Sequence, residues 1–176
     1  ALLKTLPYEL TSAQEKALKE ISIDMALPCR MNRLLHGEVG SGKTIVAALA
    51  MASAVDSGFQ AVLMAPTELL AEQHITIFIS LFKSIGIQPH LLVGGRRSGR
   101  RETLEAIRTG AARIVIGTHA LIQEDVHFAH LGLIVVDEEH RFGVVQRHDL
   151  RQKGSRADLL VMTATPIPRS LALTLY

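Results

Sequence analysis

The hydrophobic positions of the chain alternate between short runs rich in Val, Ile and Leu and longer stretches with helical spacing. The short runs contain few polar residues, which is typical of strands in a parallel sheet covered on both faces. They predict strands at 32–35, 61–64, 89–93, 113–116, 133–136 and 159–162. The longer stretches predict helices at 10–26, 43–55, 67–82 and 98–108. This alternation predicts βαβ crossovers, and so a three-layer α/β domain with a central, mostly parallel sheet.

Two of the predicted helices have a clear apolar face. The helix at 10–26 has Thr11 in the position of an N-cap and repeats apolar residues at helical spacing. The residues on that face are Ala17, Leu18, Ile21 and Met25. The helix at 98–108 turns Leu104 and Ile107 to the core. Both faces indicate helices that cover a sheet.

Composition narrows the class of protein. Of the 176 residues, 48% are hydrophobic and 20% are charged, which is globular and too apolar for a disordered chain. The uncharged stretch at 45–55 is shorter than the ~20 residues that a membrane span needs. There are 19 basic and 17 acidic residues, so the net charge of +2 neither requires nor excludes a nucleic-acid partner.

The cysteine count and the N-terminal residues indicate where in the cell the protein is located. Cys29 is the single cysteine, which rules out an internal disulfide framework and fits a reducing cytosol. The first residues, ALLKTLP, do not have the basic region and long apolar core of a signal peptide. We therefore expect a cytoplasmic protein. Because the sequence does not start with Met, we expect it to be a piece of a longer one.

A glycine-rich segment marks a phosphate site. Residues 37–44, GEVGSGKT, match the P-loop pattern G-x-x-x-x-G-K-[ST], after a predicted strand and at the start of a predicted helix. Backbone N–H groups and the positive end of the helix dipole favour phosphate there. Lys43 is expected to reach the β- and γ-phosphates, and the Thr44 hydroxyl to bind Mg²⁺. The predicted phosphate-binding residues are Gly37, Gly40, Ser41, Gly42, Lys43 and Thr44.

An acidic cluster follows the predicted strand at 133–136. Asp137, Glu138 and Glu139 would repel one another unless a cation lay nearby, and Mg²⁺ bridging phosphates would supply it. We expect Asp137 to bind Mg²⁺ and Glu138 to orient or deprotonate the attacking water. His140 could sense the state of the γ-phosphate, whereas the other seven histidines are interpreted as structural.

These motifs resemble those of superfamily 2 helicases, in the DEAH-like branch, over almost the whole chain. The matching segments are 6–14, 37–44, 64–74, 117–123, 137–144 and 163–169. The resemblance is greatest to bacterial ATP-dependent DNA helicases that remodel stalled forks. Their relative, the transcription-repair coupling factor, is the alternative, but it usually has other residues at Ser41 and Glu68. The resemblance implies a RecA-like P-loop domain, the first of two motor domains, that uses ATP and Mg²⁺ in a bacterial cytoplasm.

The resemblance also implies roles for individual residues. Gln14 would read the adenine edge, and Tyr8 would stack on the base. DNA-contacting positions would be Pro66, Thr67, Gly94, Gly95 and Thr118. Thr163 and Thr165 would couple hydrolysis to DNA movement, through hydroxyl contacts with His140 or the acidic pair. The family's second motor domain and its DNA wedge domain have no counterpart in this sequence, so the piece alone is expected to be nearly inactive.

Other interpretations remain open. A P-loop switch that recruits partners would not need Glu138, and a nucleotide kinase would leave the Pro66-Thr67 and 163–165 motifs unexplained. The four arginines of the densest basic cluster fit a solvated helix face and a contact with duplex DNA or a partner equally well. They are Arg96, Arg97, Arg100 and Arg101.

Overall fold

The computed structural model describes residues 2–6, 9–94, 99–137, 153 and 156–164. Its helices are η1 (Leu2–Thr5), α1 (Ser12–Met25), α2 (Lys43–Asp56), α3 (Glu68–Lys83), α4 (Arg100–Thr109) and η2 (His119–Ile122). Its strands are β1 (Asn32–His36), β2 (Gln60–Met64), β3 (His90–Leu92), β4 (Ile114–Gly117), β5 (Leu131–Asp137) and β6 (Asp158–Thr163). Every predicted strand and helix is present, with small shifts at the ends. The short 3-10 helices η1 and η2 were not predicted, because four residues carry no periodic signal.

The strands form one sheet in the order β1-β6-β5-β2-β4-β3, and every described pair is parallel. The order is not the order in the chain, so each connection crosses over the sheet, usually through a helix. The predicted mostly parallel sheet is therefore confirmed. All six strands point their carboxyl ends towards the same edge of the sheet.

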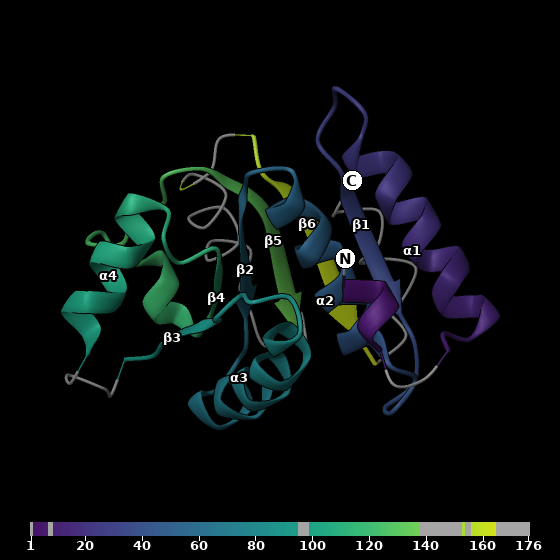
Figure 1. The fold of residues 1–176 in the computed structure, drawn as a ribbon, viewed down its shortest axis with the longest axis horizontal. Coiled ribbons are helices and arrows are strands. Elements are labelled where there is room, and N and C mark those ends of the chain that lie inside the picture. The colour runs from purple at the N-terminus through teal and green to yellow at the C-terminus, as the bar shows by residue number, and fades with distance from the viewer. Residues whose placement is uncertain (1, 7–8, 95–98, 138–152, 154–155, 165–176) are drawn as a thin grey trace, which may run out of the picture.

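Helices cover both faces of the sheet and make three layers. On one face α1, α2 and α3 pack on alternate strand residues such as Leu63, Ile116 and Val135. On the other, α4 and the segment around η2 cover Val62, Val115 and their neighbours. Figure 1 shows α1 and α4 at opposite ends of the molecule, with the sheet between them. The three-layer prediction is confirmed.

The β1 strand departs from the prediction that both sheet faces are covered. It is an edge strand, and its residues alternate between exposed and half-buried. One side is held by α1, because the Arg33 guanidinium bonds the Asp24 carboxylate and donates to Glu20 Oε2 at 2.8 Å. The bond to Asp24 raises the pKa of Arg33. Ion pairs thus fix α1 to β1 where few apolar side chains are available.

The entry into β1 is fixed by Asp158, at the start of β6. Its carboxylate accepts a hydrogen bond from the Met31 N–H at 2.7 Å, and burial raises the pKa of Asp158. The Leu159 N–H in turn donates to the Met31 carbonyl at 2.9 Å. This pair of bonds sets the register of β1 on β6, and so the position of the loop that follows β1.

The N-terminus of α1 confirms the prediction for Thr11. Its hydroxyl oxygen accepts from the Gln14 N–H at 3.3 Å, while the Gln14 side chain accepts from the Thr11 N–H at 3.0 Å. This reciprocal capping box satisfies two N–H groups that the helix cannot pair internally. The predicted face also holds: Ile21 is buried, and Ala17, Leu18 and Met25 pack against the core.

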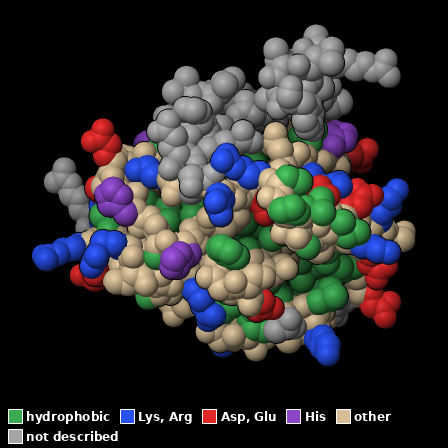
Figure 2. Space-filling model, turned by 90° about the horizontal axis from the view of Figure 1, so that it is seen from above, with side chains coloured by type: hydrophobic (Ala, Val, Ile, Leu, Met, Phe, Trp, Pro, Cys, Tyr) green, Lys and Arg blue, Asp and Glu red, His purple; other side chains and the backbone are tan. Residues whose placement is uncertain are grey.

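The described surface is mixed in charge. Figure 2 shows Lys and Arg side chains dispersed over the face seen there, with Asp and Glu between them. Among the described residues, no helix is both long enough and apolar enough to cross a bilayer.

Candidate functional site

The predicted site residues lie along the carboxyl edge of the sheet. Since adjacent strands are ~4.8 Å apart, residues that follow neighbouring strands come close in space. In sheet order, the edge carries the P-loop after β1, Thr163 on β6, Asp137 on β5, Pro66 and Thr67 after β2, Thr118 after β4, and Gly94 after β3. The P-loop and Asp137 strands are thus two strand spacings apart, with β6 between them.

The P-loop connects β1 to α2 as predicted, and α2 begins at Lys43. Gly42 has a φ of 81°, which disfavours any residue with a side chain, and a Cβ there would lie 2.3 Å from Gln14 Nε2. Lys43 Nζ donates to the carbonyls of Gly37 at 2.6 Å and Glu38 at 2.9 Å. The ammonium group therefore lies against the loop itself, beside the positive end of α2.

Gln14 joins α1 to this loop. Its Nε2 donates to the Ser41 carbonyl at 2.9 Å, while its Oε1 serves the capping box at Thr11. The structure thus brings Gln14 to the P-loop, as a base-reading role would need. Tyr8, the predicted stacking partner, lies outside the described residues.

Thr163 connects the loop to the middle of the edge. The Gly37 N–H donates to the Thr163 carbonyl at 3.3 Å, and Thr163 pairs in register with His36. The side chain of Thr163 is buried. Its predicted coupling partner His140, and Glu138 and Thr165, lie outside the described residues.

Asp137 ends β5 and hydrogen-bonds to His74, one of the histidines interpreted as structural from the sequence. His74 Nε2 lies 2.7 Å from Asp137 Oδ2, and both side chains are mostly buried. His74 ends the family-like segment 64–74, but no separate role was predicted for it, because it occupies one of the inward positions of an apolar helix. Its contact with Asp137 depends on how α3 packs on the sheet.

The residue types fit a magnesium ion. Asp137 offers a carboxylate at the edge, with 14% of its side chain exposed and one oxygen held by His74. Thr44, half-buried in the first turn of α2, offers a hydroxyl. Mg²⁺ prefers a few such oxygen ligands, with phosphates and water completing the shell. Asp137 and Thr44 are therefore suitable ligands by chemistry.

Backbone hydrogen bonds connect the loops that follow β2, β4 and β3, which form the other half of the edge. The Ala65 N–H donates to the Gly117 carbonyl at 2.8 Å, and the Thr118 N–H to the Leu92 carbonyl at 3.3 Å. Thr67 is exposed and caps α3 by accepting from the Leu70 N–H at 3.3 Å. The exposed Gly94 and half-buried Pro66 lie on the same edge.

Thr118 is placed differently from Thr67. Its side chain is 1% exposed, and among the described residues its hydroxyl has no hydrogen-bond partner. Gly95 lies outside the described residues. The structure thus brings Pro66, Thr67 and Gly94 to the surface of the edge and leaves Thr118 beneath it.

The basic cluster is only partly described. Arg100 Nη2 donates to Asp125 Oδ2 at 2.9 Å and to Gln123 Oε1 at 2.7 Å, so this guanidinium binds the loop after η2. Arg101 is exposed. Arg96 and Arg97 lie outside the described residues.

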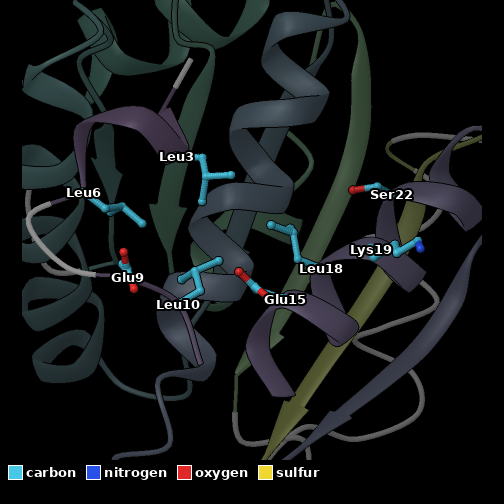
Figure 3. A pocket seen from close by; sticks show the side chains of 8 residues that line it. All are labelled: Leu3, Leu6, Glu9, Leu10, Glu15, Leu18, Lys19 and Ser22. Carbon is cyan, nitrogen blue, oxygen red and sulfur yellow. The ribbon is translucent and has the colours of Figure 1, made fainter. Parts of the chain in front are cut away.

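A separate groove of about 790 Å³ runs between η1 and α1. Figure 3 shows its leucine side chains, Leu3, Leu6, Leu10 and Leu18, with Glu9, Glu15 and Lys19 among the polar ones. No P-loop residue lines it. The groove is therefore distinct from the predicted nucleotide site.

Comparison with known families gives a match over most of the chain. Residues 11–174 match the family described as DEAD/DEAH box helicase. The "ATP-dependent DNA helicase RecG" of Streptococcus pneumoniae is 56% identical over 98% of this chain, and that of Bacillus subtilis is 53% identical over 99%. In both cases the matched region is 26% of the relative. The chain therefore spans about a quarter of the length of these relatives.

Solved structures match the same fold. A structure of RecG bound to a three-way DNA junction is 48% identical, with a TM-score of 0.85 over 99% of this chain and 24% of that chain. A structure of Saccharomyces cerevisiae Dbp5 with ADP is 19% identical, with a TM-score of 0.72 over 95% of this chain and 46% of that chain. The second likeness shows the fold alone: a parallel sheet between helices, as in RecA-like helicase domains.

Two glycines of the edge make a matched pair for testing its packing. A Cβ on Gly117 would lie 2.1 Å from the Leu92 carbonyl oxygen, whereas one on Gly94 would meet nothing closer than 3.6 Å. We expect Gly117→Ala to lower the free energy of unfolding by ~1–3 kcal/mol, because backbone must move. We expect Gly94→Ala to change it by less than ~0.5 kcal/mol. Urea unfolding of both variants checks this, and equal losses would contradict the described packing of β3 against β4.

Proposed function

The chain belongs to the DEAD/DEAH box helicase family, and we propose that it is the nucleotide-binding motor lobe of an ATP-dependent DNA helicase that remodels branched DNA. The observation that carries the proposal is the division of one sheet edge. The P-loop, Thr163 and Asp137 lie on or directly after the three adjacent strands β1, β6 and β5. The surface residues Pro66 and Thr67 follow β2, and Gly94 follows β3. Its similarity to RecG relatives, one of them solved on a DNA junction, supports branched DNA as the substrate.

On the nucleotide side, the P-loop amides and Lys43 would hold the phosphates of ATP. Lys43 would exchange its bonds to the Gly37 and Glu38 carbonyls for the terminal phosphates. Gly40 and Ser41 would contribute loop amides. Gln14 is fixed to the Ser41 carbonyl, so an adenine bound at Gln14 would be tied to the loop that holds its phosphates.

Asp137 and Thr44 would hold Mg²⁺, which supplies charge neutralisation at the phosphates when bound. Glu138 would orient the attacking water and accept its proton. His140, Thr163 and Thr165 would respond to loss of the γ-phosphate. The Gly37–Thr163 backbone bond supports this link, because it joins the phosphate loop to the strand that precedes Thr165.

On the DNA side, Pro66, Thr67, Gly94 and Gly95 would follow the sugar-phosphate backbone, whereas the buried Thr118 would support their loops from beneath. The N-terminus of α3 offers N–H groups that the helix cannot pair, which suits phosphate without reading sequence. On the face seen in Figure 2, the described Lys and Arg side chains are mixed with Asp and Glu rather than gathered in one patch.

The remaining alternatives have less support. A nucleotide kinase does not account for a helicase family match over residues 11–174. The transcription-repair coupling factor shares the motifs, but Ser41, Glu68 and the RecG relatives favour the fork-remodelling helicase. A second motor domain is proposed as the partner, since the chain covers 26% of those relatives. The bacterial relatives and the free Cys29 favour a cytoplasmic location.

The nucleotide site is tested by Lys43→Ala in the full-length protein. We expect the affinity for a fluorescent ATP analogue with Mg²⁺ to fall at least ~10-fold, because a charge-assisted contact to the phosphates is lost. Lys83→Ala, at the far end of α3, is the matched control and should bind normally. Equal affinities of Lys43→Ala and the unmodified protein would contradict the assignment of the P-loop.

The need for a second motor domain in ATP hydrolysis is tested with the 176-residue chain alone. We expect it to bind ATP and DNA weakly and to release almost no phosphate, because an arginine from a facing domain typically contributes ~10³–10⁵ in rate. One lobe also makes few phosphate contacts, so its affinity for DNA should be low and should fall less steeply with salt than that of the full-length protein. Phosphate release is measured with and without forked DNA. Strong stimulation by DNA would mean that one domain holds a complete active site.

A further inference from the structure

The contact between His74 and Asp137 joins α3 to the carboxylate at the end of β5. The two residues are 63 positions apart in the sequence, and Nε2 lies 2.7 Å from Oδ2. An ionised carboxylate can only accept hydrogen bonds, so Nε2 carries the hydrogen and donates it. The tautomer of His74 is thereby set by Asp137.

The rest of the histidine ring supports a single role. His74 is 7% exposed, and among the described residues its Nδ1 is buried without a hydrogen-bond partner. A buried polar atom without a partner costs free energy. The buried Nδ1 therefore destabilises the fold, while the other ring nitrogen, Nε2, hydrogen-bonds to Asp137. An apolar residue at this position of α3 would avoid the cost but would leave the carboxylate without its donor.

Packing fixes where the ring lies. Phe78, one turn further along α3, meets it edge to face with ring centroids 6.5 Å apart, and Phe78 stacks on Phe82 at 5.6 Å. Both phenylalanines are completely buried. The position of the donor is thus set by a rigid helix face rather than by a flexible surface side chain.

We propose that His74 is a positioning residue that holds the Asp137 carboxylate in the orientation that binds Mg²⁺. The hydrogen bond occupies one carboxylate oxygen and leaves the other for the metal. Carboxylate ligands commonly need such a second contact, and its loss typically costs 10–100-fold in metal affinity or activity. This inference rests on the proposed function, in which Asp137 is the Mg²⁺ ligand.

The position of His74 also ties that ligand to the other half of the edge. Thr67 caps α3, and His74 follows it by seven residues, which is two helical turns or ~10 Å along the axis. The same helix therefore begins at the proposed DNA contact and carries the donor to Asp137. A movement of α3 on DNA would move that donor.

Two amide variants separate positioning from packing. The side-chain nitrogen of Gln comes near the place of histidine Nε2, whereas that of Asn comes near the place of Nδ1. In the full-length protein, the Mg²⁺ concentration for half-maximal binding of a fluorescent, slowly hydrolysed ATP analogue is measured for His74→Gln and His74→Asn. His90→Asn is the control, because the Nδ1 of His90 is also buried without a partner among the described residues. His90 lies on the outermost strand β3, which β2 and β4 separate from β5.

We expect His74→Asn to raise the Mg²⁺ midpoint 10–100-fold, and His74→Gln and His90→Asn to stay within about 3-fold of the unmodified protein. Binding of the analogue in EDTA should be the same for all four proteins. If His74→Asn does not fold, His74→Met replaces it, since it fills the ring's space without a donor.

Unchanged midpoints for the donor-less variant, or equal increases for His74→Asn and His74→Gln, would overturn the positioning role. Failure of the proposed function would give a different result in the binding measurements. In that case the unmodified protein would not bind the analogue, or Lys43→Ala would bind it equally well.

Discussion

The constraint on which the structure depends is the parallel direction of its strands. Because all six described strands point the same way, every loop at their carboxyl ends opens on one edge, and the strand order decides which loops are neighbours. The insertion of β6 between β1 and β5 leaves ~10 Å between the P-loop and Asp137 strands, with Thr163 in the gap. The proposed division between nucleotide and DNA follows from that order rather than from any single motif.

Three hydrogen bonds connect distant parts of the edge. Gly37 to Thr163, Gln14 to Ser41, and His74 to Asp137 each join two elements that are distant in the sequence. Each contact also ends at a residue of the proposed nucleotide site. A ligand that displaced the loop or the carboxylate would therefore also displace α1, α3 or β6. Such a mechanical connection is required if hydrolysis is to be coupled to movement.

Local patterns in the sequence were sufficient to predict the six strands, the helices α1 to α4 and the place of the P-loop between β1 and α2. Thr11 and Gln14 form the expected cap, and Lys43 opens the expected helix, because caps and P-loops are encoded by neighbouring residues. What the sequence did not show depends on packing between distant elements. The exposure of β1 follows from its place at the sheet edge, and the contact of His74 with Asp137 follows from how α3 lies on β5.

The division of the edge is tested most directly by hydrogen exchange of backbone amides in the full-length protein. Exchange is compared after adding a slowly hydrolysed ATP analogue with Mg²⁺ and, separately, branched DNA. The account predicts that the nucleotide slows exchange in residues 37–44, and that DNA slows it around Thr67 and Gly94 but not in the P-loop. Protection of the P-loop by DNA alone, or of the segments around Thr67 and Gly94 by the nucleotide alone, would contradict it.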